Sequence, residues 1–595
     1  TKANKLKDNK NQYENFDFDE LKKNLEKVDV LTKRLVFIIA SKSKKQQITQ
    51  PNQDLYYKAA AKYFSEILSN PTKLIENQVK YYKSSLETWS DVQRYFLKQE
   101  NNNSQKNDKR FKSVTWEENP YFKMIKQQYL TSSDIIQETI TGIEGLSHPE
   151  QKQITFFTKQ MLEFFSPTNF LMTNPDALQE AMETKGQSLV NGLENLVDDL
   201  EKNDGEFNVS LTDETAFEIG KNIANAEGSV IYENKLYQLI YYKPTQEISH
   251  QIPILIIPPW INKFYILDLK PENSFIKFLL SKGIPVFLMS WVNPDSSHSE
   301  IGYDDYLKDG LLDAIEQTRR FYSVDLINSI GYCIGGTLLA TGLSYLNARK
   351  LEYIKSASFF TTLTDFEDPG DLSIFVSDEY LNTIKDQIDD LGFMDGDFLS
   401  QTFSFLRSND LIYGPAVKSY LMGKKPPPFD LLYWNSDSTN LPGKMALEYL
   451  EKFYKNNDFS RGKLEVLGEK VNLEQISQPI IAIGTFNDHI APWKSSFNGL
   501  SKTSGEKVFI LAGSGHIAGI INPEHSNKYG YWMNNENYST PEKWFNSSIN
   551  KNGSWWNEWY EWKKQFLAEK IISTKMIGIT EIEPAPGRYV KKKNK

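Results

Sequence analysis

Short apolar runs alternate with segments of helical periodicity from about residue 210 onward. Strands that alternate with helices pair in the same direction, because each crossover helix returns the chain to the same edge of the sheet. The alternation therefore predicts an α/β fold with a mostly parallel sheet, of the α/β-hydrolase kind. The expected strands are Leu236–Tyr242, Ile252–Ile257, Pro285–Ser290, Leu326–Ile330, Ser356–Thr361, Ile480–Gly484 and Lys507–Leu511.

The chain divides into two parts with different patterns. Its 595 residues exceed what one hydrophobic core usually supports, so more than one domain is expected. Residues 1–205 are mostly polar with apolar side chains at helical spacing, which predicts a mainly helical N-terminal domain. Residues 206–595 then form the α/β domain. Its alternation lapses at about 345–455, and an insertion at that place in such a sheet is typically a cap over the active site.

Composition excludes several classes of function. The formal net charge is −9 and no basic stripe with interleaved aromatic residues is present, so nucleic-acid binding is not expected. A single cysteine cannot form a disulfide within the chain or a thiolate metal site, and the six histidines lack metal-ligand spacing, so no metal is expected. The first residues lack an apolar signal segment, and the most apolar run, Ile252–Ile261, is too short to cross a bilayer. We therefore expect a cytoplasmic protein without a transmembrane segment.

The single cysteine lies in the segment Gly331–Gly336, which reads G-Y-C-I-G-G between an apolar run and a helical run. This pattern matches the nucleophile elbow of α/β hydrolases, with cysteine in place of serine. The nucleophile at such a turn has a strained backbone, and glycines beside it let strand and helix approach closely. The alternative is a buried structural cysteine, which is the usual role of a free thiol. We predict that Cys333 is a nucleophile.

The nucleophile needs a base, because a thiol with the ordinary pKa of about 8.5 is only slightly ionised at neutral pH. Elbow enzymes supply an acid and then a histidine further along the chain, each in a loop after a strand. Asp488 follows the expected strand Ile480–Gly484, and His516 follows the expected strand Lys507–Leu511. The order Cys333, Asp488, His516 therefore predicts a catalytic triad.

Three other residues compete for these roles. His489 is next to Asp488 and would point away from it along an extended segment. His525 follows a Pro-Glu step and is expected at the surface. Asp365 also follows an expected strand, Ser356–Thr361, and is the rival acid.

An oxyanion formed during acyl transfer requires backbone donors. The first is expected to be the N–H of Ile334, directly after the nucleophile. The second should come from the loop after the early strand Ile252–Ile257, at the N–H of Ile261 or Asn262. The alternative for the Pro258–Lys263 loop is an ordinary turn without a role in substrate binding.

These residues lie within a set of motifs that resembles the polyhydroxyalkanoate synthases, the class I enzymes in particular. The resemblance covers nearly the whole α/β half and extends to two short stretches before it. The matching segments are Phe165–Phe170, Thr173–Pro175, Pro258–Leu269, Ser290–Asp295, Gly331–Thr337, Asn409–Leu411, Pro428–Asn435, Asp488–Trp493, Gly515–Gly519, Asn522–Pro523, Gly553–Trp556 and Glu583–Val590. The chain departs from the usual pattern at Trp260, where relatives often have a smaller residue, and in the Lys- and Asn-rich residues 1–50.

The resemblance implies the same three residues as the motif analysis, with Cys333 as nucleophile, His516 as base and Asp488 as its partner. It also implies a substrate, 3-hydroxyacyl-CoA, and a product, a polyester that grows on a cytoplasmic granule. The CoA thioester is then a substrate and CoA a product, with no cofactor. The family further suggests a homodimer, and the N-terminal domain is expected to aid assembly or granule association.

Thiol chemistry suits this reaction, because acyl transfer from CoA to Cys333 exchanges one thioester for another and keeps the acyl group activated. With one cysteine in the chain, elongation uses either one thiol with a released intermediate or one thiol from each of two subunits, and we favour the single thiol. The predicted function is therefore a polymerising acyltransferase acting on 3-hydroxyacyl-CoA, with 3-hydroxybutyryl-CoA as the leading candidate. The alternative is a thioesterase or esterase with a cysteine nucleophile on the same fold.

Overall fold

The computed structural model describes residues 18–41, scattered residues between 61 and 86, and residues 108–594 except 535, 537–538 and 573–579. Much of the Lys- and Asn-rich segment 1–50 lies outside the described residues. The chain forms two compact units. Unit 1 comprises residues 1–213 and 407–427, and unit 2 comprises residues 214–406 and 428–595.

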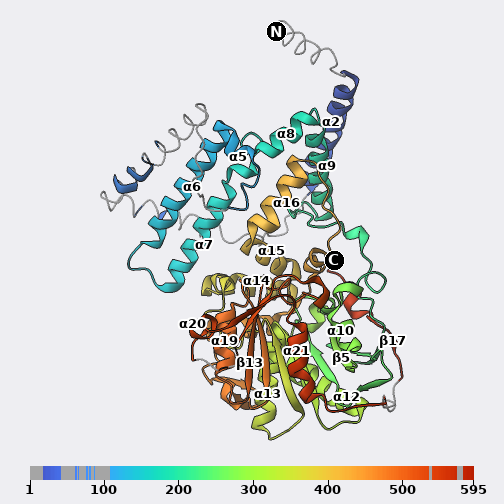
Figure 1. Ribbon diagram of the computed structural model, residues 1–595. Coiled ribbons are helices and arrows are strands. Elements are labelled where there is room, and N and C mark those ends of the chain that lie inside the picture. Colours follow the sequence, from blue (N-terminus) through green and yellow to red (C-terminus); the bar gives the residue numbers. More distant parts are fainter. Residues whose placement is uncertain are drawn as a thin grey trace. The chain divides into compact units, whose positions relative to one another are not determined.

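Unit 1 is built from helices. The helix α2 (Phe18–Ser41) lies alongside α9 (Gln187–Lys202), and an ion pair between Lys27 and Glu194 joins them (Figure 1). The other helices of its first segment are α5 (Thr115–Glu118), α6 (Pro120–Thr141), α7 (His148–Phe164) and α8 (Pro175–Glu183). Asn174 caps α8 by accepting hydrogen bonds from its first N–H groups, which explains why a helix begins there.

Residues 407–427, from the middle of the insertion, complete unit 1. They form η8 (Asn409–Tyr413), α16 (Gly414–Ala416) and η9 (Val417–Leu421), and η9 packs on α9. A Cβ atom on Gly192 of α9 would lie 1.9 Å from the carbonyl oxygen of Tyr420, so glycine permits the close approach. Unit 1 is therefore assembled from two segments that are far apart in the sequence.

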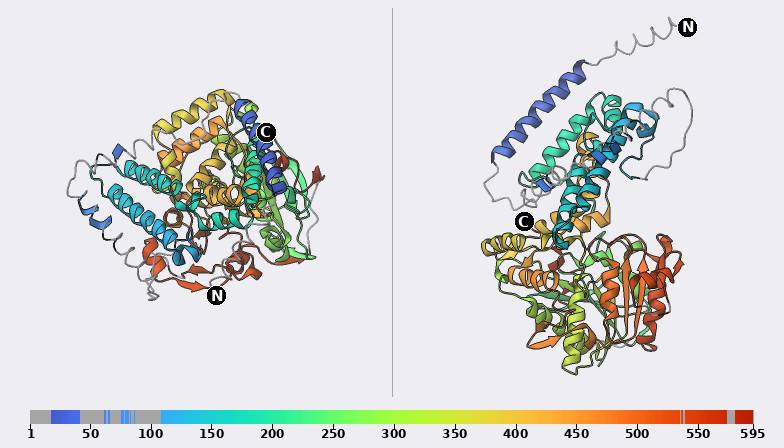
Figure 2. Two further views of the ribbon diagram at one scale, coloured as in Figure 1. Left: turned by 90° about the horizontal axis from the view of Figure 1, so that it is seen from above. Right: turned by 90° about the vertical axis from the view of Figure 1, so that its left-hand side faces the viewer.

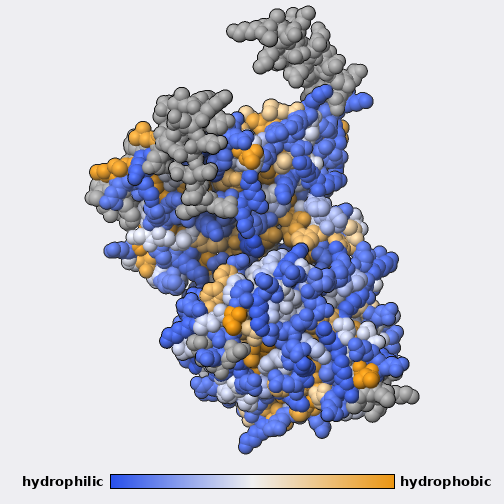
Figure 3. Space-filling model, in the orientation of Figure 1, coloured by the Kyte–Doolittle hydropathy of each residue, from blue (hydrophilic) through white to orange (hydrophobic). Residues whose placement is uncertain are grey.

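Apolar side chains also reach the surface of unit 1, where Figure 3 shows hydrophobic atoms among hydrophilic ones. In α7, Phe156 and Phe157 are buried, which indicates packing within the protein. At the end of the same segment, Phe164 and Phe165 are 49% and 64% exposed. The segment therefore contributes both to a core and to an apolar surface.

Unit 2 is built on an eleven-stranded sheet with the order β15-β14-β13-β12-β7-β6-β4-β5-β2-β1-β17. The strands from β13 to β5 in this order are parallel, and the flanking strands on both sides pair antiparallel. The strands are β1 (Ser229–Glu233), β2 (Tyr237–Tyr242), β4 (Ile254–Ile257), β5 (Val286–Trp291), β6 (Ile327–Tyr332), β7 (Ile354–Phe360), β12 (Ile480–Thr485), β13 (Lys507–Ala512), β14 (Tyr531–Met533), β15 (Ile549–Lys551) and β17 (Glu583–Pro584). The predicted α/β fold is confirmed, and all seven expected strands belong to this sheet.

Helices cover both faces of the sheet (Figure 2). Successive residues of β4 explain this, because Leu255 packs in the core on one face and Ile256 in the core on the other. The first face is covered by α12 (Asp313–Tyr322), α13 (Ile334–Ala348) and α19 (Trp493–Ser501), and the second by α10 (Phe275–Ser281) and α21 (Trp556–Lys563). The central strands are therefore buried on both sides, and their ends are fixed.

The remaining part of the insertion belongs to unit 2. It contains α14 (Asp378–Leu391), β8 (Phe393–Met394), α15 (Gly396–Leu406), α17 (Asp430–Ser436), β9 (Leu441–Pro442), α18 (Gly443–Tyr449) and η10 (Leu450–Lys455). The helix η10 has π-helical hydrogen bonding, which is rare and occurs often at functional sites. Within the described ranges, no helix is both long and apolar enough to cross a membrane.

Candidate active site

Cys333 occupies the turn between β6 and α13. Its backbone torsion angles are φ 52° and ψ −122°, outside the regions that residues with side chains usually adopt. Its N–H donates to the carbonyl oxygen of Phe360, the last residue of β7, at 2.8 Å. The neighbouring strand thus supports a strained turn, and this is the geometry of a nucleophile elbow.

Three glycines permit this turn because each is crowded by a neighbouring segment. A Cβ atom on Gly331 would lie 2.4 Å from the Cα of Gly336. A Cβ atom on Gly335 would lie 2.2 Å from the carbonyl oxygen of Ile257, and one on Gly336 would lie 2.0 Å from Oγ1 of Thr362. These distances are far inside van der Waals contact. The close approach of α13 to β6, to the end of β4 and to Thr362 after β7 therefore explains the glycines at all three positions.

Asp488 and His516 come together from the loops that follow β12 and β13. Nδ1 of His516 lies 2.7 Å from Oδ2 of Asp488. The other carboxylate oxygen accepts hydrogen bonds from the N–H groups of Ile490 and Ala491 at 2.9 and 2.8 Å. The hydroxyl of Thr485 donates to Oδ2 at 3.1 Å. The Asp488 side chain is 0% exposed, so these bonds fix its orientation toward the imidazole.

The charges around the imidazole determine its protonation. Burial lowers the pKa of His516, but the charges of Asp488 and Cys333 and the hydrogen bonds to both raise it more, to about 10. An imidazole bonded to a carboxylate through Nδ1 presents Nε2 to a group on its other side. Tyr332 stacks against the ring, with centroids 6.2 Å apart, and limits its rotation. The arrangement favours a protonated imidazole that faces the sulfur of Cys333.

Asp365, the rival acid, takes part in a different set of interactions. Its carboxylate accepts a hydrogen bond from Nζ of Lys502 at 2.7 Å. Burial raises the pKa of Asp365, but the hydrogen bond from Lys502 and further bonds lower it more, so that the net shift is downward. Among the competing histidines, His525 is exposed, and Asp488 is hydrogen-bonded to the imidazole of His516.

Most of the residues predicted for the active site line one small cavity of about 80 Å³. Cys333 and His516 line it, together with Ile334 and the loop residues Ile261 and Asn262. The insertion supplies most of the remaining wall, through mainly apolar side chains that include Met394, Phe403, Leu441, Ala446, Tyr449 and Tyr454. Small size and apolar walls limit the water that can reach a group bound to the sulfur.

The two expected oxyanion donors lie at this cavity. Ile334 is the first residue of α13, and the first N–H groups of a helix have no acceptor within it. The N–H of Thr439 donates to the carbonyl of Ile261 at 3.1 Å, and Asn262 pairs with Ser438 in an antiparallel bridge. In such a pair, without direct hydrogen bonds between its members, the N–H of Asn262 points away from Ser438. The geometry therefore favours Asn262 over Ile261 as the second donor.

Two tyrosines at the cavity were not singled out from the sequence. Tyr449 and Tyr454 lie on the continuous helix formed by α18 and η10, on the same face as Ala446 and Leu450. Steps of three and four residues between them are a helical signal that could have identified the face, but not what it contacts. Trp260 lies behind this wall and packs on Tyr449, with ring centroids 5.9 Å apart.

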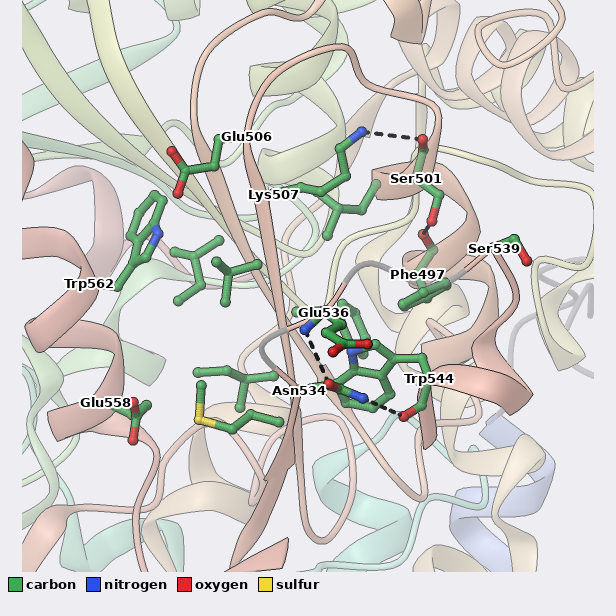
Figure 4. Close-up of a pocket in the computed structure, with 16 residues that line it drawn as sticks. Phe497, Ser501, Glu506, Lys507, Asn534, Glu536, Ser539, Trp544, Glu558 and Trp562 are labelled. Carbon is green, nitrogen blue, oxygen red and sulfur yellow. Dashed lines mark hydrogen bonds between the residues drawn. The ribbon is translucent and has the colours of Figure 1, made fainter. Parts of the chain in front are cut away.

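A larger cleft of about 710 Å³ lies elsewhere in unit 2 (Figure 4). It follows the first half of β13 and is bordered by α19 and α20 (Pro541–Asn546). Nζ of Lys507 donates to the carbonyl of Ser501 at 3.4 Å, and Nδ2 of Asn534 donates to the carbonyl of Trp544 at 3.3 Å. Its described lining contains no cysteine or histidine. The predicted chemistry therefore belongs to the smaller cavity.

The smaller cavity offers a thiol, an imidazole bonded to a carboxylate, and backbone donors. Such a set can form and break a thioester, because it supplies a nucleophile, a proton carrier and a site for the oxyanion. In the part of the chain that is described, no group of three or more His, Cys, Asp or Glu side chains is arranged to hold a metal ion.

Two family models match the chain. Residues 107–279 match the N-terminus of poly-beta-hydroxybutyrate polymerase (PhaC), and residues 252–523 match the alpha/beta hydrolase fold. The poly(3-hydroxyalkanoate) polymerase subunit PhaC of Rhizobium meliloti (strain 1021) is 39% identical over 555 residues, which cover 92% of this chain and 90% of the relative. The subunit of the same name from Cupriavidus necator is 39% identical over 495 residues, or 82% of this chain and 83% of the relative. The predicted resemblance is confirmed, and the chain belongs to the poly(3-hydroxyalkanoate) polymerases, which are acyltransferases.

Proposed function

We propose that this chain is a class I polyhydroxyalkanoate synthase that joins 3-hydroxyacyl units, with 3-hydroxybutyryl-CoA as its main substrate, and releases CoA at each step. One observation carries the proposal. His516, bonded to Asp488 at 2.7 Å, borders the same cavity as the elbow residue Cys333. Family membership supports a polymerising reaction, since the relatives are named poly(3-hydroxyalkanoate) polymerases.

Before acylation, the proton of the Cys333 thiol has passed to Nε2 of His516, so that a thiolate faces an imidazolium. The sulfur attacks the thioester carbonyl of the substrate, and the oxyanion is held by the N–H groups of Ile334 and Asn262. When the carbon–sulfur bond to CoA breaks, the imidazolium returns its proton to the leaving thiolate. Asp488 stabilises the imidazolium and keeps Nδ1 as the protonated nitrogen that faces it.

In elongation the sulfur of Cys333 is the leaving group and a hydroxyl oxygen is the nucleophile. The hydroxyl of another 3-hydroxyacyl unit, or of the growing chain, gives its proton to His516 and attacks the thioester on Cys333. The sulfur leaves and recovers the proton, so the ester forms without a net change in the enzyme. Since the chain has one cysteine, we propose that a single thiol carries out both steps, with an intermediate that is released between them. The small apolar cavity supports this cycle because it limits hydrolysis.

The product bears on where the protein works. A polyester is insoluble, and we propose that the synthase acts in the cytoplasm at the surface of the growing granule, as a homodimer. The N-terminal helical domain would aid assembly or granule contact. The exposed side chains of Phe164 and Phe165 support that role, because apolar surface of this kind favours contact with an apolar phase.

The test supplies 3-hydroxybutyryl-CoA to the purified chain and measures released CoA and the acyl product. We expect CoA release together with insoluble polymer, and complete loss of both in Cys333→Ala. Unfolding of the variant at an unchanged temperature is the control that the fold is intact. Free 3-hydroxybutyrate in place of polymer would contradict the proposal and indicate the thioesterase alternative. Dimers with one Cys333→Ala subunit should keep about half of the activity, and total loss would contradict the single-thiol cycle.

A further inference from the structure

A buried ion pair lies beside the cavity in unit 2. Nζ of Lys263 is 2.6 Å from Oδ1 of Asp437, and the two side chains are only 5% and 4% exposed. The hydroxyl of Tyr265 donates to Oδ2 of Asp437 at 2.7 Å. Taking two charges out of water costs several kcal/mol, so such a pair contributes little net stability. The role of this ion pair is then to hold neighbouring segments in place.

The pair connects two segments that border the cavity. Lys263 ends the loop after β4 that carries Ile261 and Asn262, and Asp437 lies next to Ser438 in the insertion. The backbone of Lys263 is bound as well, because Nε1 of Trp434 donates to its carbonyl at 2.6 Å. Both the side chain and the main chain of Lys263 are therefore attached to the insertion.

A third segment, residues 592–594, closes the network from the other side. Nζ of Lys263 also donates to the carbonyl of Lys592 at 3.0 Å. Nδ2 of Asn594 donates to Oγ of Ser438 at 3.1 Å, and Nδ2 of Asn293 donates to Oδ1 of Asn594 at 2.8 Å. One lysine thus lies between a carboxylate of the insertion and a carbonyl of a segment more than three hundred residues away.

We propose that Lys263 is a positioning residue for acyl transfer, and that residues 592–594 act with it. Together they hold the Pro258–Lys263 loop so that the N–H of Asn262 faces the carbonyl oxygen of the group attached to Cys333. At its other end the loop is held by Nε1 of Trp291, which donates to the carbonyl of Pro258 at 2.9 Å. Lys263 holds the opposite end of the loop, next to Asn262. This inference rests on the proposed function, since it concerns the oxyanion of that reaction.

The first test compares two reactions of the same thiol. The double variant Lys263→Met with Asp437→Asn removes both charges, and the new amide still accepts from Tyr265. We expect acylation by 3-hydroxybutyryl-CoA to slow by about 10- to 100-fold, mostly in kcat, because a misplacement near 1 Å can cost that much. Alkylation of Cys333 by iodoacetamide forms no oxyanion, so its rate should stay within about twofold of the wild-type rate.

The second test uses a milder variant with a matched control. Asn594→Ala removes the side chain that joins Ser438 to Asn293 and should slow acylation several-fold, again without an effect on alkylation. Lys591→Ala removes an exposed side chain that lies outside this network and keeps the backbone, so it should leave both rates unchanged.

Each outcome of these tests either supports or overturns the inference. Wild-type rates of CoA release in both the double variant and Asn594→Ala would overturn the inference. Parallel loss of alkylation and acylation would also overturn it, because the role of the network would then be structural. A wild-type chain that released no CoA would refute the proposed function and this inference with it, whereas equal rates in wild type and variants would refute the inference alone.

Discussion

Replacing Gly336 by alanine tests the packing that creates the elbow. The added Cβ would lie 2.0 Å from Oγ1, 2.6 Å from Cγ2 and 2.8 Å from Cβ of Thr362. Ordinary contact requires a movement of more than an ångström, either of the Thr362 side chain or of the start of α13. Overpacking of this kind costs about 1–3 kcal/mol, and the crowding by three atoms places Gly336→Ala near the upper end. A shift of α13 also moves Cys333 and the N–H of Ile334, so acylation should slow by about 10- to 100-fold.

A double-mutant cycle measures this contact. Thr362→Ala removes two of the three crowding atoms, so it should recover at least about 1 kcal/mol of the unfolding free energy lost in Gly336→Ala. Gly335→Ala is the matched contrast, because its Cβ would meet the backbone carbonyls of Ile257 and Pro258, which Thr362→Ala cannot relieve. Urea unfolding and the rate of CoA release are the two measurements. Equal recovery of both glycine variants, or a Gly336→Ala protein as stable and active as the wild type, would refute the packing argument.

Further predictions concern charges in unit 2. Asp488→Asn should lower kcat by about 10³- to 10⁴-fold, while Asp365→Asn should lower stability but keep the activity of the folded protein; the reverse pattern in CoA release would exchange their roles. The pKa of His516 is raised to about 10. Its charge therefore stabilises the folded chain fully below about pH 6.5 and progressively less as the pH rises to about 10. The difference in unfolding temperature between wild type and His516→Gln should shrink over that range. Burial lowers the pKa of Lys563 well below its ordinary value. Lys563→Met should therefore raise the unfolding temperature at pH 7, by an amount that decreases as the pH approaches about 10. An unchanged unfolding temperature at pH 7 would contradict this prediction.

The central strands could be predicted because they are buried on both faces and are therefore continuous apolar runs. Of the flanking antiparallel strands, β2 could also be predicted, as Leu236–Tyr242, but β1, β14, β15 and β17 could not. The strands β14, β15 and β17 have three, three and two residues, and so short a segment carries no periodicity. Their pairing depends on neighbours that only the folded sheet brings beside them.

That Cys333, Asp488 and His516 come together could be predicted for a different reason, since the elbow pattern is followed by an acid and a histidine in a particular chain order. The buried interactions that surround these residues could not be predicted. Charged side chains such as Lys263 and Asp437 are usually exposed, yet both are buried, because each finds its partner 174 residues away. Likewise, no local signal assigns residues 407–427 to unit 1, because the contact of Gly192 with Tyr420 is set by the tertiary fold.

The discontinuity of unit 1 has a consequence for synthesis on the ribosome. Residues 407–427, which cover α9, are translated well after residue 213 has left the ribosome, a delay of roughly ten to forty seconds at common elongation rates. During that interval the face of α9 around Gly192 and Asn195 lacks its partner η9, and Nδ2 of Asn195 lacks the carbonyl of Ser419 to which it donates at 3.1 Å. Unit 2 is also incomplete then, because β12 and β13 follow residue 427. The nascent chain therefore holds two unfinished cores at once, and this interval is the one in which we expect aggregation or chaperone binding during translation.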